Sequence, residues 1–308
     1  MKIMEDITFF ERIKLLFSLI SSSPFFVIIL LWCVMEIKNF KFKKKYGQNF
    51  LIDSNITNKI ANVIKDKTNS LVIEIGCGDG RLTKQLCNYY DKVLCYEIDE
   101  EVIPYLKDNL KTFNNYNVIL GDFLKRDVNS DIKSFKYDKL YVVANLPYYI
   151  TTPIIEKIIS SNINPDILVF MVQKEVGDRL SAKVGTKEYS SLSVYLNYYY
   201  DIKKEFILKR NCFLPSPNVD SVVVSFKKKD KMLEVYDEKL FFKLVRDSFK
   251  FKRKNIRNNL KEYNLVVIEK VLKKYNFDLN VRAEAISVDI FVDIANNLVL
   301  YEKEKWYL

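Results

Sequence analysis

The chain has 308 residues, and its 49 lysine and arginine residues outnumber the 39 aspartate and glutamate residues, which gives a formal net charge of +10. It contains no histidine, and this excludes histidine general bases, histidine metal ligands and Ser-His-Asp triads. Five cysteines without a Cys-x-x-Cys pair argue against a disulfide framework or a zinc site, so we expect no metal. The 49% hydrophobic content suits an intracellular protein with one large or two modest domains.

The N-terminus begins with an apolar extension. Residues 15–35 carry no charge over 21 positions, which is long enough for a membrane helix. Pro24 and the serine run before it weaken a continuous span, and no clear small-residue cleavage site marks a signal peptide. We favour a third explanation, in which translation starts at Met35 rather than Met1. Contact with a membrane is expected only if the extension is part of the protein.

A basic arm follows, in which lysines and aromatic residues are interleaved. Lys43, Lys44 and Lys45 lie between Phe42 and Tyr46. Cationic side chains that meet phosphates, beside rings on which bases stack, are typical of a nucleic-acid surface. A solvated lysine-rich face explains this segment equally well when it is taken alone.

Glycine clusters in one short segment. Gly76, Gly78 and Gly80 follow a predicted strand over 71–75 and precede a predicted helix over 81–88. Without Cβ atoms, the backbone of such a loop can approach a ligand closely. The spacing is Gly-x-Gly-x-Gly rather than Gly-x-Gly-x-x-Gly, which disfavours a nicotinamide-dependent oxidoreductase.

The next two predicted strands each lead to a carboxylate. The strand over 92–97 ends in Glu97, which suits the two hydroxyls of a ribose, and the strand over 117–120 is followed by Gly121 and Asp122, which suits an adenine amino group. The carboxyl ends of parallel strands share one edge of a sheet, so we expect both acids beside the glycine loop. For either acid alone, a solvated strand end is the simpler interpretation.

A fourth strand, over 141–145, delivers Asn145, Leu146, Pro147 and Tyr148 to the same edge. The Asn145 side-chain carbonyl and the Leu146 backbone carbonyl, fixed by the rigid bond to Pro147, offer two acceptors for the two protons of an exocyclic amine. Tyr148 adds a face on which a base can stack. The segment therefore predicts a site for a planar amine, although a strand that ends in a turn would use the same residue types.

Further strands are expected near Ile167, Leu192 and Val219, alternating with helices until about residue 227. This order predicts a doubly wound, Rossmann-like α/β sheet. The charged residues 226–231 form a candidate linker. A small helical part should follow.

The C-terminal part is expected to contain helices over 238–248 and 265–275. Between them lies a second basic segment with aromatic neighbours, which contains Phe249, Phe251, Lys252, Arg253, Lys254 and Arg257. It has the same two interpretations as the N-terminal arm, a nucleic-acid surface or a solvated basic face.

Several motifs together resemble a known family. Residues 74–80, Glu-Ile-Gly-Cys-Gly-Asp-Gly, look like the first motif of S-adenosylmethionine-dependent methyltransferases, and residues 145–148 look like the motif of those that methylate the exocyclic nitrogen of adenine. Four more segments resemble the small-subunit ribosomal RNA adenine N6,N6-dimethyltransferase family, namely residues 45–51, 172–176, 213–221 and 282–284. The resemblance runs from about residue 40 to the C-terminus and implies a class I methyltransferase sheet.

The resemblance also implies roles for the matched residues. Glu97 is expected on the ribose of S-adenosylmethionine and Asp122 near its adenine. The full set of expected cofactor contacts is Asn49, Leu51, Gly76, Gly78, Glu97, Asp122 and Asn145. The target adenine is expected at Asn145, Leu146, Pro147 and Tyr148, with Phe213 near its other face. Expected RNA contacts are Lys43, Lys44, Lys45, Phe213, Lys252, Arg253, Lys254 and Arg257. Tyr149 departs from those family members that have Asn after the Asn-Leu-Pro-Tyr motif. This difference affects the expectation of a secondary contact, not that of the reaction.

The implied reaction is dimethylation of two adjacent adenines in a hairpin loop near the 3′ end of the small-subunit (16S) RNA, as a step of ribosome biogenesis. The implied partner is this RNA or the assembling small subunit, and we expect a monomer in the cytoplasm. The expected domains are an extension over 1–34, a methyltransferase domain with its basic arm over 35–227, and a helical RNA-binding domain over 228–308. A start at Met35 resembles the usual beginning of the family.

Two other functions remain open. A related class methylates a large-subunit adenine and confers macrolide resistance, and Leu146 together with residues 282–284 favours the small-subunit class over it. A non-enzymatic role as a ribosome-assembly or transcription factor on the same fold is also possible. Asn145 and Glu97 are intact and favour catalysis, but they do not exclude a second role as a scaffold.

Overall fold

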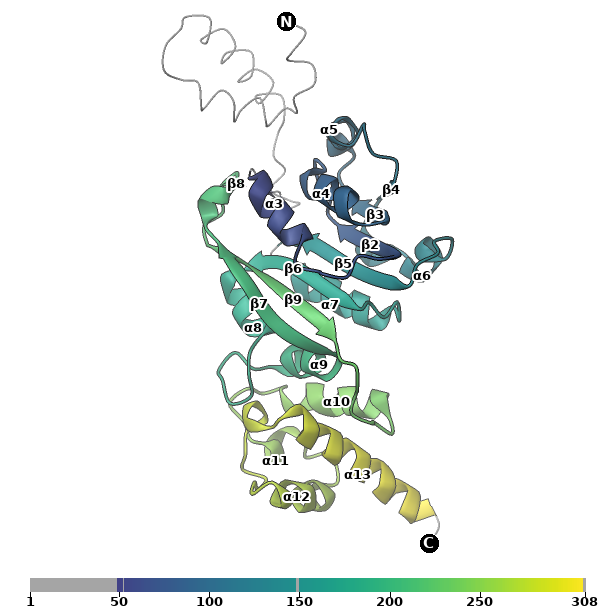
Figure 1. Cartoon of the computed structure of the whole chain (residues 1–308). Coiled ribbons are helices and arrows are strands. Elements are labelled where there is room, and N and C mark those ends of the chain that lie inside the picture. The colour runs from purple at the N-terminus through teal and green to yellow at the C-terminus, as the bar shows by residue number, and fades with distance from the viewer. Residues whose placement is uncertain (1–48, 52, 148–149, 307–308) are drawn as a thin grey trace, which may run out of the picture. The chain divides into compact units, whose positions relative to one another are not determined.

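The computed structural model describes residues 49–51, 53–147 and 150–306 (Figure 1). The apolar segment 15–35 and the three arm lysines at 43–45 lie outside the described residues, as does Tyr148. None of the helices formed by the described residues combines the length and the apolar character that a membrane span requires.

The chain folds as two compact units. The first contains the residues up to Val172 and the segment Ile207–Ser221, and the second contains Gln173–Phe206 and Val222–Leu308. The C-terminal helices therefore belong to the same compact unit as residues 173–206. The expected functional boundary between residues 227 and 228 stays a prediction.

Five strands of the first unit pair side by side in parallel. They are β2 (Ser70–Ile75), β3 (Lys92–Glu97), β4 (Tyr116–Leu120), β5 (Lys139–Asn145) and β6 (Ile167–Gln173). They pair in the order β4-β3-β2-β5-β6, and each neighbouring pair is parallel. The strand order reverses between β2 and β5, which makes this the topological switch point outside which ligands bind in doubly wound sheets.

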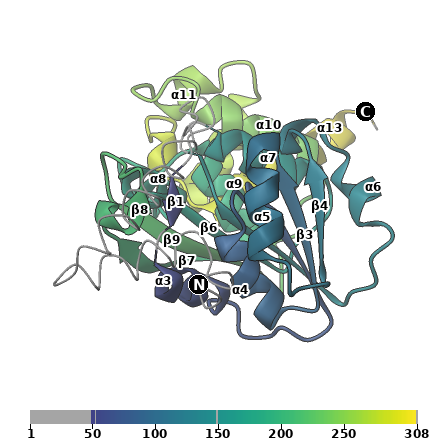
Figure 2. The same cartoon turned by 90° about the horizontal axis from the view of Figure 1, so that it is seen from above.

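The burial of these strands explains their sequences. Leu71, Val72 and Ile73 of β2 are 0% exposed, because a central parallel strand is covered on both faces. The edge strand β4 is only partly buried, and Asn117 and Leu120 are exposed. Figure 2 shows β3 and β4 side by side, in agreement with their register, which places Glu97 opposite Leu120.

Helices connect the strands of the first unit. They are α3 (Ser54–Ala61), α4 (Arg81–Tyr89), α5 (Ile103–Asn109), α6 (Val128–Ile132) and α7 (Thr151–Ser160), with 3-10 turns η3 (Glu100–Val102), η4 (Phe123–Lys125) and η5 (Arg210–Cys212). Local capping sets several of their starts. The Asp53 carboxylate, for example, accepts a hydrogen bond of 2.8 Å from the Asn55 backbone N–H at the start of α3.

A two-stranded sheet joins distant parts of the first unit. Strand β1 (Phe50–Leu51) pairs antiparallel with β8 (Phe213–Leu214). Leu51 lies opposite Phe213, and both are buried.

The second unit consists mainly of helices. They are α8 (Lys174–Leu180), α9 (Ser191–Tyr199), α10 (Glu238–Ser248), α11 (Ile256–Asn259), α12 (Leu265–Lys274) and α13 (Val288–Trp306), with the 3-10 turn η6 (Ala283–Ala285). Strands β7 (Tyr200–Leu208) and β9 (Ser221–Lys228) are neighbours.

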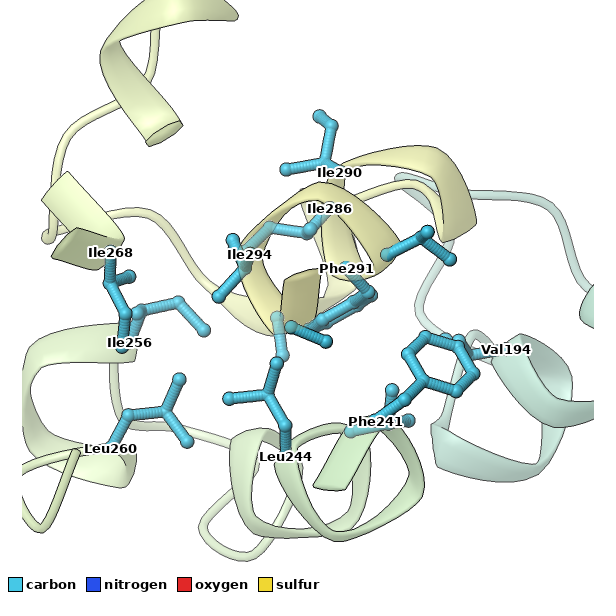
Figure 3. Close-up of a cluster of buried hydrophobic side chains, with 14 of the residues drawn as sticks. Val194, Phe241, Leu244, Ile256, Leu260, Ile268, Ile286, Ile290, Phe291 and Ile294 are labelled. Carbon is cyan, nitrogen blue, oxygen red and sulfur yellow. The ribbon is translucent and has the colours of Figure 1, made fainter. Parts of the chain in front are cut away.

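The second unit has its own hydrophobic core (Figure 3). Phe241 and Leu244 of α10 and Phe291 and Ile294 of α13 are 0% exposed and lie in this cluster. Val194 of α9 joins them. These contacts stabilise the helices that carry the second basic segment.

Most expected elements are confirmed, and two expectations are wrong. The strand expected near Leu192 is helix α9, which starts there because Ser190 and Ser193 form a capping box. The candidate linker was placed too early, since β9 continues through Lys228. The helix expected over 238–248 coincides with α10.

Candidate active site at the sheet edge

A pocket of about 1100 Å³, measured with its open mouth, lies at the carboxyl edge of the first unit's sheet. Nine of the expected site residues line it: Asn49, Leu51, Gly76, Gly78, Glu97, Asp122, Asn145, Leu146 and Pro147. They come from β1 and from the ends of β2, β3, β4 and β5. The structure thus brings together the residues that the sequence placed at one edge, and their roles stay predictions.

The glycine loop forms one wall of the pocket. Gly76 has a φ of +75° and its N–H donates to the Tyr96 carbonyl at 2.8 Å, which fixes the loop against β3. A Cβ on Gly76 would meet no atom within 4 Å, so the left-handed backbone rather than crowding is what favours glycine there. At Gly78 a Cβ would lie 2.8 Å from a ring carbon of Phe50. The loop therefore exposes bare backbone to the pocket at Gly76 and packs closely under Phe50 at Gly78.

Glu97 connects this loop to the end of β3. One carboxylate oxygen accepts from the Gly78 N–H at 2.7 Å, and the other accepts from the N–H groups of Ile98 and Asp99, both at 2.9 Å. Burial raises the pKa of Glu97, whereas these three N–H groups oppose the rise. A carboxylate has about four acceptor positions, so capacity for a ligand hydroxyl remains beside the loop.

Asp122 lies farther along the same edge, as the N-cap of η4. It accepts from the Leu124 N–H at 3.0 Å, and the Lys125 ammonium is 3.9 Å from its second oxygen. Three apolar residues beside the two acids also line the pocket, namely Ile98, Phe123 and Leu124. Sequence reasoning missed them. Ile98 is 46% exposed. Its position directly after Glu97 is the signal by which it could have been found.

Asn145 is the last residue of β5. Its amide nitrogen donates to the Asn49 carbonyl at 3.1 Å, which leaves the side-chain oxygen as an acceptor for a ligand. The Leu146 N–H donates to the Met171 carbonyl at 3.1 Å and extends the pairing with β6 by one residue. The Pro147 carbonyl accepts from the Ile150 N–H at 3.2 Å. The segment after β5 is therefore held by backbone contacts with β6 and with the turn that leads into α7.

Phe213, which is expected near the target base, belongs to strand β8. It is 3% exposed, lies opposite Leu51 in the β1-β8 pair and is not among the residues that line the pocket. Its contact with a substrate base stays a prediction.

A buried acidic and sulfur-containing cluster lies beneath the glycine loop. Glu74 is 1% exposed, and its carboxylate oxygen is 3.9 Å from the sulfur of Cys95. Burial raises the pKa of Glu74 to about 8, with repulsion from Glu97 and Asp79 adding to the rise and the hydrogen bond from the Cys95 thiol opposing it. Cys87 and Cys95 are both buried.

The second basic segment is exposed on the second unit. The side chains of Lys252, Arg253, Lys254 and Arg257 are exposed, and Phe251 is 56% exposed. The Asn259 side chain holds this loop, because it accepts from the Phe251 N–H at 3.1 Å and donates to the Ser248 carbonyl at 2.7 Å. Phe249, by contrast, packs against the core cluster.

No group of three or more cysteine, aspartate and glutamate residues among the described residues has the arrangement of a metal site.

Glu74 generates a prediction for stability against pH. Between its usual pKa of 4.5 and about 8, the folded chain keeps this carboxyl protonated while the unfolded chain ionises it. Unfolding then releases a proton, so stability falls as the pH rises through this window, by up to about 1.4 kcal/mol per pH unit. Glu74→Gln removes this contribution, and its free energy of unfolding in urea should fall less steeply from pH 5 to pH 8 than that of the wild type.

Glu262→Gln provides the matched control, because the Glu262 side chain is 80% exposed and should leave the pH slope unchanged. Equal slopes for the wild type and Glu74→Gln would show that Glu74 ionises normally in the folded chain.

Comparison with known proteins shows the family of this chain. The family model described as ribosomal RNA adenine dimethylase matches residues 39–299. Proteins named ribosomal RNA small subunit methyltransferase A from Bacillus mycoides (strain KBAB4) and Bacillus cereus (strain AH187) are each 41% identical over 280 residues, which cover 87% of this chain and 95% of the relative.

Solved structures agree on the fold. A dimethyladenosine transferase from Plasmodium falciparum matches with a TM-score of 0.67 and 27% identity, covering 82% of this chain and 97% of that one. The 23S rRNA methyltransferase ErmE matches with a TM-score of 0.66 and 22% identity, covering 82% of this chain and 100% of that one. These likenesses confirm the expected Rossmann-like methyltransferase sheet with a helical C-terminal part. The chain belongs to the ribosomal RNA adenine dimethylase family.

Proposed function

We propose that this chain uses S-adenosylmethionine to dimethylate the N6 atoms of two adjacent adenines in a hairpin loop near the 3′ end of small-subunit (16S) ribosomal RNA, as a step of ribosome biogenesis. The observation that carries the proposal is that the glycine loop, Glu97, Asp122 and the Asn145-Leu146-Pro147 segment line the same pocket. The relatives that are 41% identical carry the name of a small-subunit RNA methyltransferase. This name supports small-subunit rather than large-subunit RNA as the substrate.

The residues of the pocket suit S-adenosylmethionine. The backbone at Gly76 can lie against the ligand without a side chain between them. Glu97 has an acceptor position left for the ribose hydroxyls, and Asp122 can accept from an adenine amino group. Ile98 and Leu124 offer an apolar surface for the adenine ring. When bound, the cofactor supplies a methyl group on a positively charged sulfur, which is already strongly electrophilic.

The chain's own task is then to position the target amine. The side-chain oxygen of Asn145 and the carbonyl of Leu146 accept the two amino protons and orient the nitrogen lone pair. The same acceptors stabilise the positive charge that develops on the nitrogen during transfer. No strong base is required, which agrees with a chain that has no histidine. Tyr148 is proposed to stack on the target base.

The second basic segment and the N-terminal arm are proposed to bind the RNA backbone. The exposed cations of the loop after α10 suit phosphates, and the exposed ring of Phe251 suits an unpaired base. An adenine in an unpaired loop costs little to extrude, so it is a favourable substrate. We place the enzyme in the cytoplasm as a monomer, on the assembling small subunit.

Two alternatives receive less support. The ErmE likeness, at 22% identity, concerns the fold and says nothing about which RNA this chain modifies. A purely structural role in ribosome assembly would not require Asn145 and Glu97 to line one pocket with the glycine loop.

Labelled methyl transfer tests the proposal directly. Protein begun at Met35 is incubated with labelled S-adenosylmethionine and with unmethylated small or large ribosomal subunits, and modified adenines are mapped by primer extension. We expect label on two adjacent small-subunit adenines. Asn145→Ala should lower the rate by roughly 100-fold or more, because it removes one of the two acceptors that align the amine.

The same variant should retain most of its affinity for S-adenosylmethionine in calorimetry, since the other cofactor contacts remain. Label confined to the large subunit would make this a resistance-type enzyme, and an unchanged rate in Asn145→Ala would remove Asn145 from the proposed mechanism. Absent transfer by a folded, cofactor-binding protein would favour the scaffold role.

The second basic segment makes a separate prediction. The triple variant Lys252→Ala, Arg253→Ala, Lys254→Ala should weaken binding to small-subunit RNA by about tenfold or more at low salt. It should also reduce the dependence of affinity on salt, by about one unit of slope for each phosphate that the variant no longer neutralises. Filter binding at a series of salt concentrations measures both quantities.

A charge-matched control is Lys239→Ala, Lys261→Ala, Lys270→Ala, which removes three exposed lysines of the same unit outside this loop. If the two triple variants show the same salt dependence, the loop is a solvated basic face and not an RNA contact.

A further inference from the structure

The segment 49–51 is held in place by a partly buried arginine that sequence reasoning did not single out. Arg81 is the first residue of α4, and its guanidinium donates to the Leu51 carbonyl, 30 positions earlier, at 3.0 Å. We propose that Arg81 is a positioning residue, which fixes segment 49–51 as one wall of the pocket and thereby sets the affinity for S-adenosylmethionine. This inference rests on the proposed function.

The guanidinium makes two contacts in different directions. Nη1 donates to the Leu51 carbonyl, while Nε donates to the Asp79 carboxylate at 2.9 Å. The side chains of Arg81 and Asp79 are 17% and 9% exposed, so little water competes for these contacts. Charge-assisted hydrogen bonds in such surroundings are stronger than neutral ones and are specific in direction.

Asp79 is itself well fixed. Its carboxylate also accepts from the Arg81 backbone N–H at 3.4 Å, and its backbone carbonyl accepts from the Asn109 side chain of α5 at 2.7 Å. Burial raises the pKa of Asp79, and the charge and hydrogen bonds of Arg81 oppose the rise. The glycine loop, α4 and α5 therefore provide a rigid base from which Arg81 reaches Leu51.

The segment held by Arg81 contacts both sides of the pocket. The ring of Phe50 lies over Gly78, and the Asn49 carbonyl accepts from the amide nitrogen of Asn145. Asn49, Phe50 and Leu51 all line the pocket. Loss of the hydrogen bond to the Leu51 carbonyl would make the wall that faces the cofactor less well fixed. It would also weaken the contact that orients Asn145.

A competing explanation is that Arg81 only neutralises the buried charge of Asp79. Lysine separates the two roles. Lysine carries the same charge, but its single ammonium lacks the planar guanidinium that donates to Asp79 and to Leu51 from two different nitrogens. If neutralisation were the only role, Arg81→Lys would behave as the wild type.

The experiment uses the full chain. Calorimetry with S-adenosylmethionine should show a dissociation constant raised by about tenfold in Arg81→Lys, as expected for the loss of one charge-assisted hydrogen bond. The KM for the cofactor should rise in parallel, with the KM for RNA unchanged. Without cofactor, hydrogen exchange at the backbone amides of residues 50 and 51 should be faster than in the wild type. Arg246→Lys, at an exposed position on α10, serves as the matched control for all three measurements.

Each outcome has a distinct meaning. A wild type that does not bind S-adenosylmethionine overturns the proposed function, whereas a wild type that binds and an Arg81→Lys variant with equal affinity and equal exchange overturn the role of Arg81. If Arg81→Lys does not fold, the double variant Asp79→Asn, Arg81→Gln replaces it, because it leaves no unpaired buried charge. Wild-type affinity in that folded double variant would equally contradict the inference.

Discussion

The carboxylate of Glu97 ties the glycine loop to the end of β3, and the shape of the pocket depends on that contact. Its two oxygens accept three backbone N–H groups, one from the loop at Gly78 and two from the turn after β3. A buried charge is tolerated only where such donors surround it. One side chain therefore orders two adjacent strand ends, and the ligand that we propose would bind against an already formed edge of the sheet.

From that edge, a short series of contacts leads to Asn145, which we propose orients the target amine. Phe50 lies over Gly78, Asn49 accepts from Asn145, and the pairing of β1 with β8 supports Leu51. Segments near residues 50, 78, 145 and 213 thus form one framework within the first unit. The proposed mechanism needs little more than this framework, because alignment of an amine with an activated methyl group is its main requirement.

The sequence predicted those features that depend on local signals. Strand β3 and helix α10 coincide with their expected bounds, since each has a clear apolar pattern and a capped or polar end. The helix at Leu192 was missed because a serine capping box, Ser190 with Ser193, outweighed an apolar run that is typical of a strand. The contact of Arg81 with Leu51 spans 30 positions, and the burial of Phe213 depends on the pairing of two-residue strands more than 160 positions apart. No local pattern encodes either contact. Ile98 was overlooked because its role arises only from its place at the edge.

The most direct test of the central claim, that the carboxyl edge of the first unit binds the cofactor, is hydrogen exchange of the full chain with and without saturating S-adenosylmethionine. The account predicts slower exchange in residues 49–51, 76–80 and 97–99, with no change in helices α10 to α13. Slowing confined to the second unit, or none at all, would contradict it.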